Sequence, residues 1–266
     1  MKKKLQFELV YQIGALVVSI VLVHLVYVTL IRPNAEVILA DQAQRVAAGE
    51  AFVQDRSLYV VLRDYEQESC FILMFWAIAI MGLKARAAFA ERNLLNQEFV
   101  QISEGMSILP EDTREHTRPI QALPEDQQES LLPRTLLAAL HRFSSTRNVQ
   151  DVSEAVKSVC DAESDRLDSE LSMVRYIAWA IPSIGFIGTV RGIGEALGQA
   201  YRAVEGDIAG VTTSLGVAFN STFIALVISI VLMFLMHQLQ LIQERLVLDT
   251  HTYADQKLLR HLQVRG

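Results

Sequence analysis

The segment from Ile181 to Ile193, IPSIGFIGTVRGI, determines most of what the sequence indicates about the fold. It is apolar, and its glycines recur at three- and four-residue spacing, which places them on one face of a helix. Small residues at this spacing let two helices approach closely in a bilayer. The segment therefore predicts either a packing face or a smooth wall against which a partner helix turns, formed by Pro182, Gly185, Gly188 and Gly192.

A second apolar stretch, Leu215 to Met236, follows after a short loop and carries Asn220, Ser221 and Thr222 within it. Two helices joined by a short loop run antiparallel. Counted from that loop, Thr189 and Thr222 fall at a similar depth. A threonine in a membrane helix commonly bonds a carbonyl of its own turn or of a neighbouring helix. The sequence leaves this packing role open beside a role in lining a pore.

These two stretches are similar to the pore helices of the MotA/TolQ/ExbB proton-channel family. The first resembles that family's P-x-I-G-x-x-G-T-V-x-G-I signature at every fixed position, and the second resembles its threonine-bearing helix. The resemblance implies a proton path lined by Thr189, Thr222, Asn220 and Ser221. Arg191 and Asn220 depart from the family pattern, and Ser229-Ile230-Val231 stand where the family has a late proline.

Composition indicates a membrane protein. The chain has 266 residues, 51% of them apolar, and a mean hydropathy of +0.26. Crossing a bilayer takes about 20 apolar residues in a helix. Four stretches meet or approach this length, so we predict an all-α polytopic membrane protein with four transmembrane helices and long cytoplasmic helical extensions. The stretches are Leu9–Ile31, Cys70–Leu83 with its flanks, Tyr176–Leu197 and Val217–Met236.

Basic residues near the span ends predict the orientation. Three lysines begin the chain, and Lys84, Arg86 and Arg92 follow the second span, so both termini are expected in the cytoplasm. The first span is too long for a cleavable signal and is interpreted as a retained anchor. We expect a multi-pass protein of the bacterial inner membrane, in contact with the lipid bilayer.

Breaker residues and apolar periodicity suggest five regions. The second span is expected to continue as a helix to about Ser103, and prolines make 105–132 the main break, after which Pro133 opens a short helix. One helix is expected from Val149 through the third span, kinked at Pro182, and the fourth span runs on to Leu258. The regions are an anchor span (1–31), an external helical segment (32–69), a second span with its extension (70–104), a proline-rich cytoplasmic loop (105–148) and the channel domain (149–266).

The two pore helices contain no acidic residue at mid-depth. A proton relay through a membrane needs a titratable group or a continuous chain of water. The resemblance implies that a single-span partner of the ExbD/TolR/MotB type supplies an intramembrane aspartate. Arg191 and Glu195, one helical turn apart, are expected at the outer pore mouth, where Arg191 either snorkels or places a positive charge. His24 lies within the first span, as a proton-handling residue or as a neutral, hydrogen-bonded one.

The sequence contains no phosphate-binding glycine loop, no HExxH motif and no cysteine cluster, so we predict no enzyme activity, no metal and no cofactor. The net charge of −6 argues against nucleic acid as a partner. We expect an inner-membrane proton-channel subunit, a homo-pentamer, that couples the proton-motive force to mechanical work through its partner. The alternatives are a MotA-like flagellar stator subunit and a non-conducting membrane scaffold.

Overall fold

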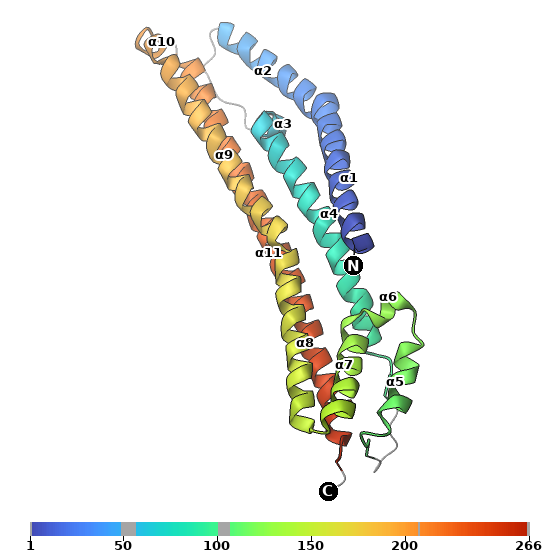
Figure 1. The fold of residues 1–266 in the computed structure, drawn as a ribbon. Coiled ribbons are helices and arrows are strands. Elements are labelled where there is room, and N and C mark those ends of the chain that lie inside the picture. The colour runs from blue at the N-terminus through green and yellow to red at the C-terminus, as the bar shows by residue number, and fades with distance from the viewer. Residues whose placement is uncertain (1, 49–56, 101–106, 207, 265–266) are drawn as a thin grey trace. The chain divides into compact units, whose positions relative to one another are not determined.

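A computed structural model describes residues 2–48, 57–100, 107–206 and 208–264 (Figure 1). These residues form helices and connecting turns, with one isolated parallel bridge between Ile108 and Leu262. The chain divides into two compact units. Unit 1 comprises residues 1–82 and 173–236, and unit 2 comprises residues 83–172 and 237–266.

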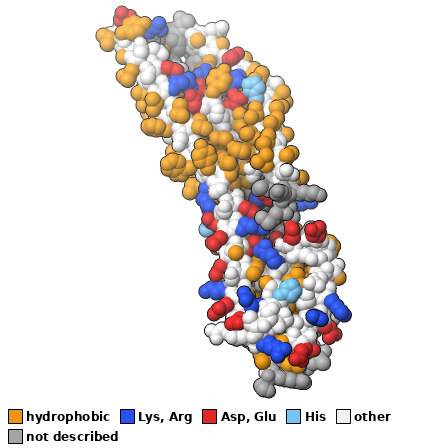
Figure 2. Space-filling model, viewed as in Figure 1, with side chains coloured by type: hydrophobic (Ala, Val, Ile, Leu, Met, Phe, Trp, Pro, Cys, Tyr) orange, Lys and Arg blue, Asp and Glu red, His pale blue; other side chains and the backbone are white. Residues whose placement is uncertain are grey.

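Four helical stretches are long and apolar enough to cross a membrane, namely Gln6–Arg45, Tyr65–Leu94, Val149–Gly198 and Ala209–His261. The predicted all-α fold with four membrane-spanning helices is therefore confirmed. Figure 2 shows hydrophobic side chains over much of the visible surface of unit 1, whereas charged side chains are spread over unit 2. An outward apolar surface suits contact with lipid tails or with other membrane helices.

Unit 1 begins with one nearly continuous helical stretch and ends with the two predicted pore helices. The first stretch consists of α1 (Lys2–Val26), the π-helical turn η1 (Tyr27–Ile31) and α2 (Arg32–Ala47). Helices α3 (Leu58–Leu62) and α4 (Tyr65–Leu94) follow, and then α9 (Ser172–Gly198), α10 (Ala200–Val204) and α11 (Ala209–Lys257). The residues of α4 after Gly82 and of α11 after Met236 belong to unit 2. Part of the predicted external helical segment, residues 49–56, lies outside the described residues.

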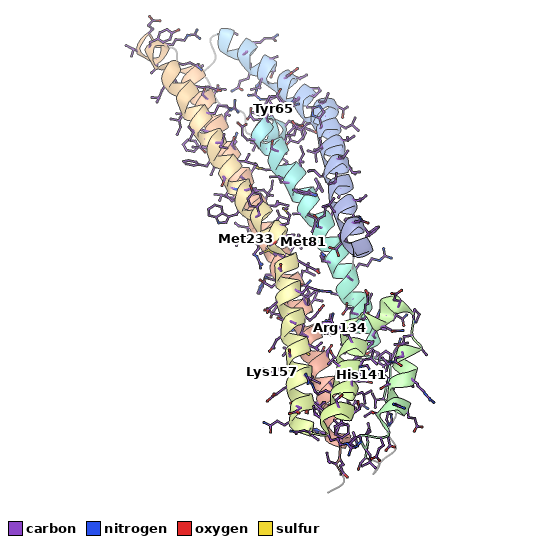
Figure 3. All side chains as sticks on the ribbon, in the orientation of Figure 1. Tyr65, Met81, Arg134, His141, Lys157 and Met233 are labelled. Atoms are coloured by element: carbon purple, nitrogen blue, oxygen red, sulfur yellow. The ribbon has the colours of Figure 1, made fainter. Side chains whose placement is uncertain are left out.

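Unit 2 is built around α7 (Leu131–Thr146) and α8 (Val149–Glu170), with α5 (Thr113–Gln121), α6 (Glu125–Gln128) and η2 (Leu259–His261) beside them. Arg147 takes a left-handed conformation after α7, and the Asn148 side chain caps α8 by accepting from the Gln150 amide at 2.9 Å. The core includes Leu136, Leu140, Phe143, Val152, Val156 and Leu258. Arg134 and His141 lie on α7, and Lys157 on α8 (Figure 3).

The helix boundaries differ from the sequence prediction in two places. Helix α4 ends at Leu94, before Ser103. The region 105–132 is not simply a break, because α5 forms there with Pro119 inside it and a buried face of Thr113, Thr117 and Ile120. Packing of that face overrides the local preference against proline. The helix predicted from Val149 does run as one helical stretch to Gly198, with a single turn residue, Leu171, dividing it into α8 and α9. The kink at Pro182 stays a prediction.

Candidate functional site

The interface between α9 and α11 depends on glycine. Gly185, Gly188 and Gly192 all lie on the buried face of α9. A Cβ atom added at Gly185 would lie 2.5 Å from the Cβ of Ala225, and one added at Gly192 would lie 2.7 Å from the carbonyl oxygen of Ser214. Carbon atoms in ordinary contact are about 3.5–4.0 Å apart. Any side chain at these positions would therefore push the two helices apart.

Thr189 of α9 and Thr222 of α11 meet in this interface, and their hydroxyls are hydrogen-bonded to each other. Thr222 Oγ1 also lies 3.0 Å from the carbonyl oxygen of Gly185, and Thr189 Oγ1 lies 3.1 Å from that of Ala218. Each hydroxyl has one proton to donate and two lone pairs. The pair therefore has more acceptors than protons, so the two hydroxyls have alternative ways to share their hydrogen bonds. Neither hydroxyl titrates near neutral pH, so the pair is uncharged however its hydrogen bonds are shared.

The neighbouring predicted site residues take different positions. Ser221 is buried against Gly188, where an added Cβ would lie 2.5 Å from its own Cβ, and its hydroxyl donates to the Val217 carbonyl at 2.9 Å. Asn220 is half-buried, and its side chain makes no hydrogen bond within the described part of the chain. Pro182 is half-buried within α9. The structure thus brings Thr189 and Thr222 together and leaves Asn220 apart.

One further hydrogen bond between these helices was missed by sequence analysis. The buried Ser229 hydroxyl of α11 donates to the Ala178 carbonyl of α9 at 3.0 Å. The sequence shows only one polar residue, Ser229, in the apolar run from Phe223 to Met236. This is a weak indication of a contact between helices, because a serine hydroxyl also bonds to carbonyls of its own helix. Together with the threonine pair, this bond fixes the register of α9 against α11.

Arg191 is held by two carboxylates. Its Nε and Nη2 atoms lie 2.8 Å and 2.9 Å from the two carboxylate oxygens of Glu66, in the first turn of α4. Its Nη1 atom lies 3.2 Å from Glu195. The Arg191–Glu195 contact is the pair that sequence spacing permits. Glu66 was missed, although a two-pronged arginine–carboxylate contact is the stronger kind. Arg191 is therefore an anchor between α4 and α9 as well as a charge near the threonine pair.

A second polar cluster joins the first and second predicted spans. Glu68 of α4 is buried, and its carboxylate contacts Arg32 of α2 and lies 2.7 Å from His24 Nδ1 of α1. The Arg32 guanidinium lies 4.3 Å from the centre of the Tyr65 ring, the residue labelled at the start of α4 in Figure 3. Sequence analysis singled out His24 but not Glu68. The available signal was that an ionisable residue inside a span requires a polar partner.

Asp64 lies just before α4, beside these two clusters. Burial raises the pKa of its carboxyl, whereas the charges of Arg63 and Arg191 lower it. In Figure 2, a group of basic, acidic and histidine side chains lies within the hydrophobic surface of unit 1. Among the described residues, no group of three His, Cys, Asp or Glu side chains is placed to hold a metal ion.

Comparison with known proteins gives one match, to a family model. No curated protein and no solved structure matches the chain. Residues 127–252 match the model of the MotA/TolQ/ExbB proton channel family. The matched region contains both the glycine face of α9 and the threonine pair that joins it to α11. Over residues 127–252, the chain is therefore similar to the MotA/TolQ/ExbB proton channel family.

Proposed function

We propose that the chain is a subunit of an inner-membrane proton-driven motor, in which α9 and α11 line the proton path at Thr189 and Thr222. In this proposal a single-span partner of the ExbD/TolR/MotB type completes the path. Proton passage protonates an aspartate on the partner and turns one ring of helices against the other. The motion delivers mechanical work.

The threonine pair is the single observation that carries the proposal. Two hydroxyls that lie 33 positions apart in the sequence contact each other inside the region that matches a proton channel family. They supply polar surface in helices that are otherwise apolar at this level, because Phe186, Val190 and Phe223 around them are exposed and hydrophobic. Hydroxyl groups in such a wall hold water molecules, and a chain of water carries protons.

The partner follows from what the two helices lack. The sequence between Ile181 and Ile193, and again between Leu215 and Met236, contains no aspartate or glutamate. Glu66 does approach α9, but its carboxylate is engaged by Arg191 at 2.8 and 2.9 Å. This two-pronged contact occupies both oxygens of the Glu66 carboxylate, so neither oxygen is open to a chain of water in the pore. The exchanging carboxylate therefore comes from another chain.

Assembly into a ring explains the apolar surface of unit 1. Large side chains such as Trp179, Phe219 and Phe234 are mostly exposed. Five copies around two partner helices would cover part of this surface, and lipid would cover the rest. Both termini lie in the cytoplasm in this arrangement, as the basic residues near the span ends predict.

Two other roles are compatible with the sequence. A MotA-like flagellar stator subunit would share the four-span layout and the same pore chemistry. A non-conducting scaffold is favoured by one observation, because the hydroxyls of Thr189 and Thr222 already find partners within a single chain, at Ala218 and Gly185. In that reading the pair only fixes helix packing.

Mass spectrometry of the intact complex tests the assembly. The tagged full-length chain is extracted from its native membrane in a mild detergent, and the mass of the complex is measured without denaturation. We expect five copies of this chain with two copies of a smaller protein, and sequencing of that protein should show one span with an aspartate in it. A spectrum of monomers alone, or of a ring whose companion has no acidic residue in its span, would reject the proposed motor.

A further inference from the structure

The first two spans contain a buried ion cluster that the proton path between α9 and α11 does not use. His24 Nδ1 lies 2.7 Å from Glu68 Oε1, and Arg32 contacts the other oxygen of the same carboxylate. The Glu68 side chain is 7% exposed, whereas that of His24 is 59% exposed. A buried carboxylate therefore contacts one nitrogen of a histidine ring that is itself largely exposed.

The π-helical turn Tyr27–Ile31 brings His24 and Arg32 to the same carboxylate. Eight residues of a regular α-helix make about 2.2 turns, which would point these two side chains about 80° apart. A π turn absorbs one extra residue. The remaining seven or so residues make close to two whole turns, so His24 and Arg32 share the face that meets α4. Turns of this kind occur frequently at functional sites.

The contacts determine which nitrogen of His24 is free. A carboxylate that pairs with arginine is ionised and only accepts hydrogen bonds. His24 Nδ1 must therefore carry the proton that is donated to Glu68. The other nitrogen, Nε2, is left as the acceptor in the neutral ring. A proton that binds there converts His24 to an imidazolium whose charge faces Glu68.

Other charged and titratable groups surround the pair. Tyr27 is buried, and its hydroxyl has no hydrogen-bond partner in the described structure. While His24 is neutral, the charges of Arg32 and Glu68 balance, and a second proton, bound at Nε2, adds one uncompensated positive charge. Arg32 contacts Glu68 directly, and its guanidinium lies over the rings of Tyr27 and Tyr65. Asp64 is close enough to interact electrostatically with Tyr27, and also with Arg63, Glu66 and Arg191.

Helix α4 links this cluster to the helix that carries Thr189. Glu66 lies two residues before Glu68, and both of its carboxylate oxygens accept hydrogen bonds from Arg191. The Cγ atom of Glu66 also lies 3.2 Å from where a Cβ of Gly188 would be, so the start of α4 packs directly on the backbone of α9. A change of charge or position at Glu68 therefore acts on the first turn of α4, which contacts α9 at Gly188 and Arg191, on either side of Thr189.

We propose that His24, oriented by Glu68, is a second proton-binding site in the first two spans, and that its protonation acts through the start of α4 on Arg191. The site binds a proton at Nε2 of the imidazole and requires no other ligand. It does not depend on the proposed motor function, because a chain that conducts no protons could still bind one at His24.

Nuclear magnetic resonance of the full chain in lipid nanodiscs tests both parts. Histidine and arginine side chains are labelled with ¹⁵N and followed from about pH 5 to pH 8, the range in which histidines change charge. The chain has six histidines. Signals are assigned with His24→Asn and Arg191→Lys, and His251→Asn, which removes an exposed histidine of α11, is the matched control.

We expect a His24 signal that titrates in this range, and that carries its proton on Nδ1 when neutral. The Arg191 Nε signal should shift over the same pH interval. That shift should be lost in His24→Asn, whose amide still donates to Glu68 but takes up no proton, and kept in His251→Asn. The site is rejected if His24 keeps one charge state throughout, or if its neutral form is protonated on Nε2. The link to α9 is rejected if the Arg191 shift is the same in both variants.

Discussion

Replacing Gly192 by alanine should weaken the α9–α11 interface, whereas the same change at Gly194 should not. A Cβ at position 192 would lie 2.7 Å from the Ser214 carbonyl oxygen and 2.8 Å from both the amide nitrogen and the Cβ of Ala218. Two of these three atoms belong to the backbone, so the helices must separate by roughly 1 Å to restore ordinary contact. Overpacking of this kind costs about 1–3 kcal/mol. At Gly194 an added Cβ meets nothing within 4 Å.

The comparison removes the effect of helix propensity. Both substitutions gain the same ~1 kcal/mol of helix stability when glycine becomes alanine. The difference in unfolding free energy between Gly192→Ala and Gly194→Ala is therefore the packing cost alone, about 1–3 kcal/mol.

Unfolding of the full chain by SDS in mixed micelles measures this difference. The two tryptophans, Trp76 and Trp179, both belong to unit 1, and their fluorescence follows its unfolding. We expect Gly192→Ala to unfold at a lower SDS fraction than Gly194→Ala, with an unfolding equilibrium shifted by about 5- to 150-fold. Equal midpoints, or a more stable Gly192→Ala, would refute the close approach of α9 and α11.

Two other predictions concern topology and unit 2. A single cysteine placed at position 55, which lies outside the described residues, should react with a membrane-impermeant reagent from outside intact cells, and one at position 130 only from inside, because both native cysteines are buried; labelling of 130 from outside would overturn the orientation. Glu163 is buried between Arg134 at 2.6 Å and Arg166 at 2.9 Å. Glu163→Gln removes the negative charge that holds both arginines and should therefore destabilise unit 2. The cost should be limited to about 1–3 kcal/mol, because the two arginines are partly exposed and can still be hydrated by water. An unchanged melting temperature would argue against this ion pair.

Local sequence patterns predicted the elements of the channel region well, because its helices are long and their apolar faces are regular. Thr189 and Thr222 were expected at one depth from equal counting along two antiparallel helices, and their hydroxyls do meet. The motif around Thr189 also predicts a close contact between helices, because glycines at fixed spacing in an apolar helix let a neighbouring helix approach its backbone.

The partners of Arg191 and His24 could not be predicted in the same way. Glu66 lies 125 residues from Arg191, and Glu68 lies 44 residues from His24. Their pairing depends on how α4 packs against other helices and on the π turn after His24, which no periodicity in the sequence indicates. Helix α5 was missed for a related reason, since its buried face overrides the preference expressed by Pro119.

Proton flux through the intact complex tests whether Thr189 and Thr222 line the proton path. Thr→Val keeps the shape of each side chain and removes its hydroxyl. If the pair only packs, losing its hydrogen bonds should cost about 0.6 kcal/mol each and leave flux intact. We predict that the double Thr189→Val, Thr222→Val variant, reconstituted with its partner in liposomes, keeps the mass of the wild-type complex and loses most of its flux. Wild-type flux from a double-mutant complex of unchanged mass would contradict it.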